Sequence, residues 1–143
     1  MRVEQDRRSD SAERTHTWGR DLAERLKPGV CVLLVGDLGA GKTTLMRGIA
    51  EGLGIDPTEI HSPTFVLIHE HEGRLPLYHV DAYRVSDPDE LVEVGLLEYL
   101  HGDGVTVIEW GDQVRTLVPD DAWEIRLHHV DEGRRRIELV VPS

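Results

Sequence analysis

Apolar residues recur at helical spacing in three stretches of the chain, and each stretch carries a start or a stop signal. The first covers residues 10–27 and ends at Pro28-Gly29, and the second covers Thr43–Leu53 and ends at Gly54. The third begins at residues 87–90, where Asp87 is the expected N-cap, Pro88 the first helical residue and Glu90 the closing residue of a capping box. Three helices are therefore predicted, the last running to about Leu100.

Shorter apolar stretches bounded by turn residues predict strands. Val30–Val35 and Val105–Glu109 are almost continuously apolar, as expected for central strands covered on both faces. Residues 66–71 and 75–81 flank Gly73, and residues 123–130 and 136–141 flank Gly133, which predicts two antiparallel pairs. The elements together predict an α/β fold: a mixed sheet with central parallel strands, flanked by helices and antiparallel edge strands.

Length and composition fit one globular domain over residues 1–143, with residues 1–9 expected to form a loose tail. A hydrophobic content of 39% and a charged content of 30% exclude a disordered chain. No apolar run approaches the ~20 residues that cross a bilayer, and the N-terminus lacks the apolar core of a secretory signal. Cys31, the only cysteine, lies within an apolar strand and is expected to be a buried core residue. A cytoplasmic location is therefore predicted.

The formal net charge of −11 restricts the choice of partners. Binding to a polyanion depends on cationic side chains that neutralise phosphates, and the densest basic cluster here, Arg134–Arg136, lies beside acidic residues. We therefore expect no direct binding to tRNA or DNA and no contact with a membrane, and an acidic surface suits docking on other proteins.

Residues 36–43 read GDLGAGKT and match the phosphate-loop (Walker A) pattern G-x-x-x-x-G-K-[ST] at every fixed position. A predicted buried strand precedes the loop and a predicted helix follows it, so that backbone N–H groups and a helix N-terminus would face a phosphate. Lys42 is expected to reach the β- and γ-phosphates, and the hydroxyl of Thr43 to coordinate Mg²⁺. The predicted nucleotide-binding residues of the loop are Gly36, Asp37, Leu38, Gly39, Ala40, Gly41, Lys42, Thr43 and Thr44.

A phosphate loop needs an acid at the end of a neighbouring strand, and two residues qualify. Asp81 ends LPLYHVD and Glu109 ends VTVIE, and ligands of such sheets gather at the carboxyl ends of strands. Residue types alone leave open which of the two lies at the metal. The histidines at positions 69, 71 and 79 lie in predicted strands, where residues i and i+2 share a face. They are interpreted as exposed strand residues rather than as a metal cluster.

The base preference favours ATP. Guanine-specific proteins use an Asn/Thr-Lys-x-Asp motif, but this chain contains no Asn, and its second lysine, Lys27, lies upstream of the loop. A small phosphate-loop kinase is the runner-up, although such an enzyme normally adds a lid and a substrate-binding insertion.

The segments GDLGAGKTT, HSPTF, YHVDAYR, DELVEVG and IEW, in this order, resemble the TsaE (YjeE) family, phosphate-loop ATPases required for the tRNA modification threonylcarbamoyladenosine, t6A. The resemblance implies a P-loop NTPase fold. It implies catalytic roles for Lys42, for Thr64 near the γ-phosphate or metal and for Asp81, with Glu109 as the Mg²⁺-associated acid. It also implies that Thr15, Gly133 and Arg134 close around the nucleotide.

By the same resemblance, the expected function is binding and hydrolysis of ATP with Mg²⁺, in support of turnover by a TsaB–TsaD complex. That complex forms the N6-threonylcarbamoyl group on adenosine 37 of tRNAs reading ANN codons. A nucleotide-dependent assembly switch, in which binding rather than hydrolysis does the work, remains the competing expectation.

Overall fold

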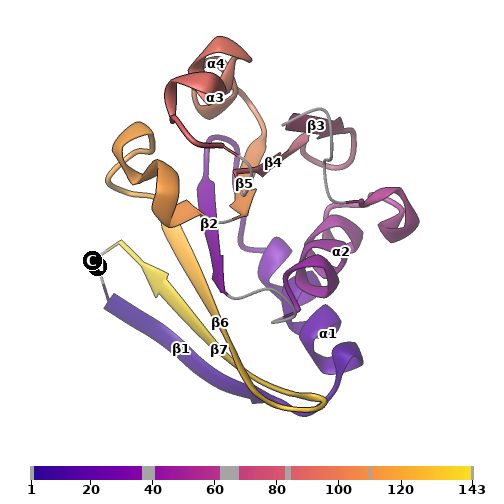
Figure 1. The fold of residues 1–143 in the computed structure, drawn as a ribbon. Helices are drawn as coiled ribbons and strands as arrows, with labels where there is room; N and C mark the ends of the chain where they lie inside the picture. The colour runs from indigo at the N-terminus through magenta and orange to yellow at the C-terminus, as the bar shows by residue number, and fades with distance from the viewer. Residues whose placement is uncertain (1, 37–40, 62–67, 83–84, 110, 143) are drawn as a thin grey trace.

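A computed structural model describes residues 2–36, 41–61, 68–82, 85–109 and 111–142, with the backbone alone described for residues 111–113 (Figure 1). The strands are β1 (Arg2–Ser9), β2 (Cys31–Gly36), β3 (Ile68–His71), β4 (Leu77–Asp81), β5 (Val105–Glu109), β6 (Trp123–Asp131) and β7 (Arg134–Val141). The helices are α1 (Ala12–Ala23), α2 (Lys42–Gly52), α3 (Asp89–Glu93) and α4 (Leu96–Leu100), with the 3₁₀ segments η1 (Pro57–Glu59) and η2 (Gly111–Leu117).

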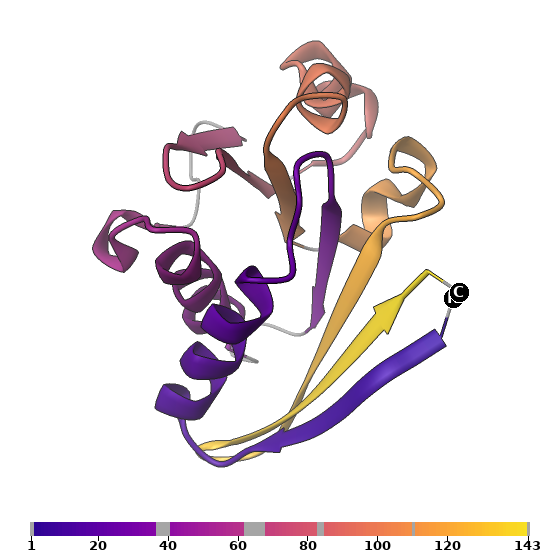
Figure 2. The ribbon, with the colours of Figure 1, turned by 180° about the vertical axis from the view of Figure 1, so that it is seen from behind.

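The strands form one mixed sheet in the order β1-β7-β6-β2-β5-β4-β3. The four central strands, β6, β2, β5 and β4, run parallel, whereas β3 at one edge and β7 and β1 at the other are antiparallel to their neighbours. Figure 2 shows β1 running beside the long β6–β7 hairpin. The predicted fold class is confirmed, as are the two antiparallel pairs around Gly73 and Gly133.

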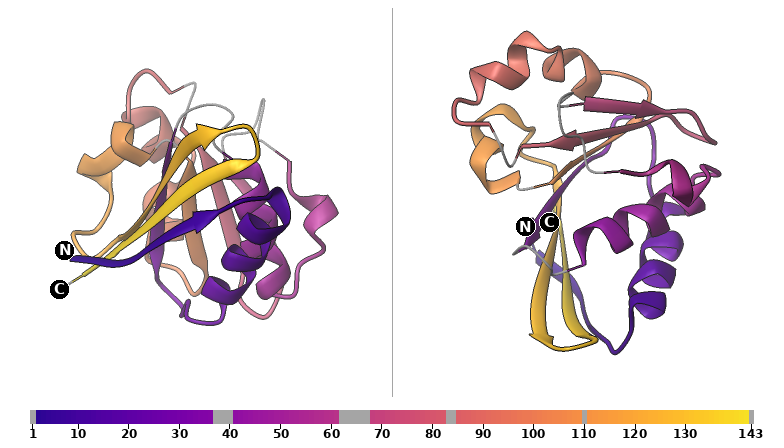
Figure 3. Two further views of the ribbon diagram at one scale, coloured as in Figure 1. Left: turned by 90° about the horizontal axis from the view of Figure 1, so that it is seen from below. Right: turned by 45° about the vertical axis from the view of Figure 1, so that its right-hand side comes forward.

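Strand β2 lies in the middle of the sheet because its side chains are apolar in both directions. Val32 and Leu34 point into a core shared with α1 and α2, while Cys31 and Leu33 point into a second core formed with α3 and α4. Figure 3 shows these two helical layers on opposite sides of the strands. Cys31 is 4% exposed, which confirms the prediction of a buried thiol, and this burial raises its pKa to about 12.

The helices begin and end close to the predicted signals, with one exception. The hydroxyl of Ser11 caps α1 by accepting a bond from the N–H of Arg14 at 3.1 Å. The single helix predicted from Asp87 to Leu100 is instead two short helices, separated at Gly95, whose φ of 100° is left-handed. Glu90 does not close the predicted capping box, because its carboxylate accepts a bond from the hydroxyl of Ser86. Among the described residues, no helix has the length and apolar character needed to cross a bilayer.

The predicted loose tail is wrong for Arg2–Ser9, which forms the edge strand β1. It pairs with β7 from Arg2, opposite Val141, to Ser9, opposite Arg135. The strand is rich in charged residues, so it carries no apolar signal, and its side chains are held by polar partners instead. Arg136 donates two hydrogen bonds to the carboxylate of Asp6, and the indole N–H of Trp18 donates one to Gln5 at 3.1 Å.

Candidate nucleotide-binding site

The carboxyl ends of β2, β5 and β4 lie side by side and bring the two predicted acids together. In the parallel register, Leu34 of β2 lies opposite Glu109 of β5, and Glu109 lies opposite Asp81 of β4. Glu109 is therefore on the strand next to β2, and Asp81 is one strand further away. Both acids share the sheet face of Leu34, which is the face that α1 and α2 cover.

The phosphate loop joins β2 to α2, and its two flanks have the geometry that an anion site requires. Gly41 occupies the N-cap of α2 with a left-handed φ of 98°, and a glycine has no side chain with which to cap the first amides of the helix. Lys42 is 7% exposed, and its ammonium group donates a hydrogen bond to the carbonyl of Gly36, so the side chain reaches back to the end of β2. Together, the uncapped amides and the ammonium group suit a phosphate.

Several predicted site residues lie outside the described part of the chain. They are Asp37, Leu38, Gly39 and Ala40 of the loop and Thr64 within residues 62–67.

A cavity of about 100 Å³ adjoins the start of α2. It brings together three segments that are distant in sequence: the start of α1, the start of α2 and the β6–β7 turn. Thr15, which is buried, shares a hydrogen bond of 2.7 Å with the hydroxyl of Ser9. The lining residues are Ser11, Ala12, Thr15, Gly41, Thr44, Gly133 and Arg135. Thr15 and Gly133, both predicted at the nucleotide, thus meet Gly41 and Thr44 in one place.

The arginine at this cavity is Arg135 rather than the predicted Arg134. Arg134 is exposed and donates a hydrogen bond to Asp131 at 2.8 Å, which raises the pKa of its guanidinium group. Neighbouring residues of a strand point to opposite faces, so one of the two must face away from the cavity. The guanidinium of Arg135 lies close to Gly41, its Nε 3.8 Å from where a Cβ on that glycine would stand. The alternation of side chains between the two faces of a strand was the sequence signal that could have pointed to Arg135.

A buried histidine that sequence reasoning missed also reaches this site. His79 was interpreted as exposed, but it is 1% exposed, and its Nε2 lies 2.8 Å from Oε2 of Glu109, which is itself 4% exposed. His79 precedes Asp81 by two residues and therefore shares its face, which was the available signal. In the described part of the chain, no group of three or more metal-ligating side chains stands ready to hold an ion.

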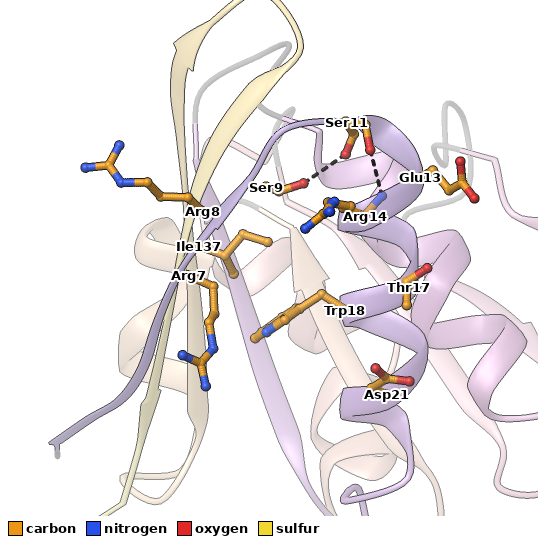
Figure 4. Close-up of a pocket in the computed structure, with 10 residues that line it drawn as sticks. All are labelled: Arg7, Arg8, Ser9, Ser11, Glu13, Arg14, Thr17, Trp18, Asp21 and Ile137. Carbon is orange, nitrogen blue, oxygen red and sulfur yellow. Dashed lines mark hydrogen bonds between the residues drawn. The ribbon is translucent and has the colours of Figure 1, made fainter.

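A larger groove of about 540 Å³ lies between β1 and α1 (Figure 4). In this view Arg8 points away from α1, whereas Trp18 and Arg14 project from the helix toward the strand. Charges of both signs line the groove, and Arg14 is already paired with Asp10 at 3.0 Å. The groove shares Ser11 with the small cavity but contains none of the predicted nucleotide-binding residues. The residues that line the two cavities, rather than their volumes, therefore favour the smaller one as the candidate site.

Comparison with known proteins identifies the family. The family model described as "Threonylcarbamoyl adenosine biosynthesis protein TsaE" matches residues 9–137. The chain belongs to the TsaE family. Proteins described as "tRNA threonylcarbamoyladenosine biosynthesis protein TsaE" are 43% identical in Treponema pallidum, over 92% of this chain and 96% of that protein, and 42% identical in Bacillus subtilis, over 91% and 81%. The one from Haemophilus influenzae is 36% identical over 88% of this chain and 82% of that protein.

A solved structure supports the same assignment. The crystal structure of YdiB from Bacillus subtilis is 35% identical in sequence and superimposes with a TM-score of 0.82, covering 100% of this chain and 89% of YdiB. The chain therefore has the phosphate-loop fold of this family, and the resemblance drawn from five short segments is confirmed.

Proposed function

We propose that this protein binds and hydrolyses ATP with Mg²⁺ and that its cycle supports a TsaB–TsaD complex in forming t6A on tRNA. The observation that carries the proposal is the meeting of the acids Glu109 and Asp81 with the end of β2 on the face of the sheet covered by α2. The role in t6A formation follows from membership of the family, whose relatives carry that function in their names.

The donor set fits a magnesium nucleotide. The amides at the start of α2 and the ammonium group of Lys42 suit the phosphates, and the oxygens of Thr43 and Glu109 are ligands of the kind that Mg²⁺ accepts. When bound, the ion would neutralise charge on the β- and γ-phosphates. The cavity lined by Thr15, Gly133 and Arg135 adjoins the start of α2 and would accept a further part of the nucleotide. Asp81, beside Glu109, would position the attacking water or the metal, and Thr64 is proposed to act near the γ-phosphate or the metal.

Hydrolysis by the isolated protein is expected to be slow. Transition-state charge in phosphoryl transfer is commonly stabilised by an arginine, and partner proteins often supply it. A partner that contributes a cation to the site would raise the rate. With a net charge of −11, the chain suits partner proteins better than free tRNA.

The experiment measures ATP turnover by the protein alone, with tRNA, and with TsaB–TsaD. We expect stimulation by the protein pair and little by tRNA. Stimulation by tRNA without any from the pair would show that the partner class is wrong. Full t6A turnover with a non-hydrolysable analogue would favour the assembly switch over the ATPase cycle.

A matched variant tests the phosphate site itself. Lys42→Met keeps the length of the side chain but removes charge-assisted hydrogen bonds worth about 1.5–3 kcal/mol each, so ATP affinity is expected to fall at least about tenfold. Calorimetry would measure the affinity, with circular dichroism as the check on folding. Unchanged affinity in a folded Lys42→Met protein would contradict the assignment of the loop.

A further inference from the structure

The pair formed by His79 and Glu109 is unusual for its burial at the edge of a proposed metal site. The two side chains are 1% and 4% exposed and meet at 2.8 Å between Nε2 and Oε2. The β4–β5 register fixes their backbones, because His79 lies opposite Val107 and Asp81 lies opposite Glu109. The imidazole therefore reaches Glu109 diagonally along one face of the sheet, two residues before Asp81.

Within the described part of the chain, the carboxylate of Glu109 is held by a side chain on one side only. An ionised carboxylate can only accept, so Nε2–H of His79 is the donor and Oε2 the acceptor. The second oxygen, Oε1, is not engaged by the histidine. The other ring nitrogen of His79, Nδ1, is buried without a hydrogen-bond partner among the described residues. His79 is thus a single-point tether on one oxygen of Glu109.

We propose that His79 is a positioning residue that holds the Glu109 carboxylate in the orientation required by the Mg²⁺–nucleotide complex. The inference rests on the proposed function, in which Glu109 is the acid associated with the metal. A partner that orients a ligating carboxylate contributes strongly to metal binding, and its loss typically costs 10–100-fold in metal affinity. His79 is the side chain that the structure places in that role.

A purely structural role for the pair is the competing explanation, and it predicts a different result. If the pair only stabilised the sheet, its removal would change the free energy of unfolding and would leave the Mg²⁺ dependence of nucleotide binding unchanged. A positioning residue should change the Mg²⁺ dependence while leaving metal-free nucleotide binding intact.

The test measures the affinity for a fluorescent ATP analogue over a Mg²⁺ titration and again in EDTA. In His79→Leu we expect the Mg²⁺ concentration at half-maximal effect to rise about 10–100-fold, with affinity in EDTA within about twofold of the parent. His79→Gln, whose amide can still donate to Oε2, should recover most of the loss. His69→Leu is the matched control, because His69 lies opposite His79 on β3 and, among the described residues, it is His79 and not His69 that bonds Glu109.

A double variant separates positioning from folding. Glu109→Gln removes the charge that His79 holds, so adding His79→Leu should have no further effect on Mg²⁺ dependence. Additive effects, or a His79→Leu protein with the parental Mg²⁺ dependence, would overturn the inference. If the parent itself shows no Mg²⁺ dependence, the proposed metal role of Glu109 fails, and the inference fails with it for that separate reason.

Discussion

Two buried glutamates flank the central strand β2, and their surroundings differ in a way that separates structure from function. Glu109 on β5 lies opposite Leu34, and Glu124 on β6 lies opposite Leu33. Their exposed fractions are almost the same, 4% and 3%. Because Leu33 and Leu34 point to opposite faces, Glu109 shares the face of α2, whereas Glu124 lies on the face of α3 and α4.

The number of donors to each carboxylate is the decisive difference. Arg115 pairs with Oε1 of Glu124 and Arg126 with Oε2, so both oxygens face a cation. Among the described residues, the carboxylate of Glu109 receives one bond, from His79 to Oε2. Both oxygens of Glu124 are therefore compensated by cations within the protein. This arrangement is what a structural role for a buried carboxylate requires. Burial alone would have marked both residues as site candidates; the partner count and the sheet face select Glu109.

The largest expected effect concerns the stability supplied around Glu124. Replacing both Arg115 and Arg126 with alanine leaves a buried carboxylate without a cation, which typically costs about 3–5 kcal/mol of unfolding free energy. Denaturant unfolding would measure the loss. Adding Glu124→Leu should restore most of it, because the unpaired charge is then gone. A double arginine variant as stable as the parent would show that water, not the arginines, satisfies Glu124.

The next effect concerns the Mg²⁺ dependence of nucleotide binding and tests Glu109. In Glu109→Gln, the Mg²⁺ concentration at half-maximal effect on nucleotide binding should rise at least about 100-fold, which corresponds to about 2.8 kcal/mol. Glu124→Gln, an equally buried change on the opposite face, is the matched control and should leave it unchanged. Asp81→Asn should spare binding and mainly reduce turnover. Loss of metal-dependent binding in Asp81→Asn, with retention in Glu109→Gln, would reverse the roles of the two acids.

The elements around β2 were predictable because the apolar pattern and the flanking turn residues of each segment indicate the same structure. Val105–Glu109 was predicted with its observed bounds, and the apolar residues of β2 fit no other place than the centre of a sheet. β1 was missed because Arg2–Ser9 has charges where a strand signal would be apolar, and its partners are the backbone of β7 and side chains such as Arg136, which bonds Asp6. Such partners are distant in sequence, so no local pattern contains them.

The candidate site likewise contains some residues that the sequence predicted and others that it did not. The loop, Asp81 and Glu109 follow from local motifs, and Thr15 and Gly133 follow from the family resemblance. His79 and Arg135 depend on which strand neighbours which, since each reaches the site only through its register. Local motifs therefore identified the loop and the two acids, whereas the positions of His79 and Arg135 became visible only from the pairing of the strands.

A smaller effect is expected from pH. Burial by itself would raise the pKa of Glu124, but hydrogen bonds from Arg126 and Arg115 outweigh it and hold the pKa below its usual value of 4.5. The contribution of Glu124 is then fully present above about pH 4.5 and is lost as the pH falls through the lower folded-state pKa, because the unfolded chain binds the proton first. Unfolding free energy measured from pH 6 to pH 3 should fall less steeply in Glu124→Gln than in the parent. Equal slopes would show that Glu124 does not contribute to acid unfolding.

The smallest expected effect concerns Cys31, which lies on β2 on the same face as Glu124. Burial, with a smaller contribution from Asp121, raises the pKa of its thiol to about 12, so hardly any thiolate exists at neutral pH. The native protein should therefore show almost no reaction with a disulfide reagent at about pH 8, and full reaction after denaturation. Cys31→Ala should leave nucleotide binding and its Mg²⁺ dependence unchanged, since the changed side chain faces away from α2 and Glu109. A shift in Mg²⁺ dependence in that variant would show that the two faces of the sheet are coupled through β2, and the separation between a structural glutamate and a functional one would no longer hold.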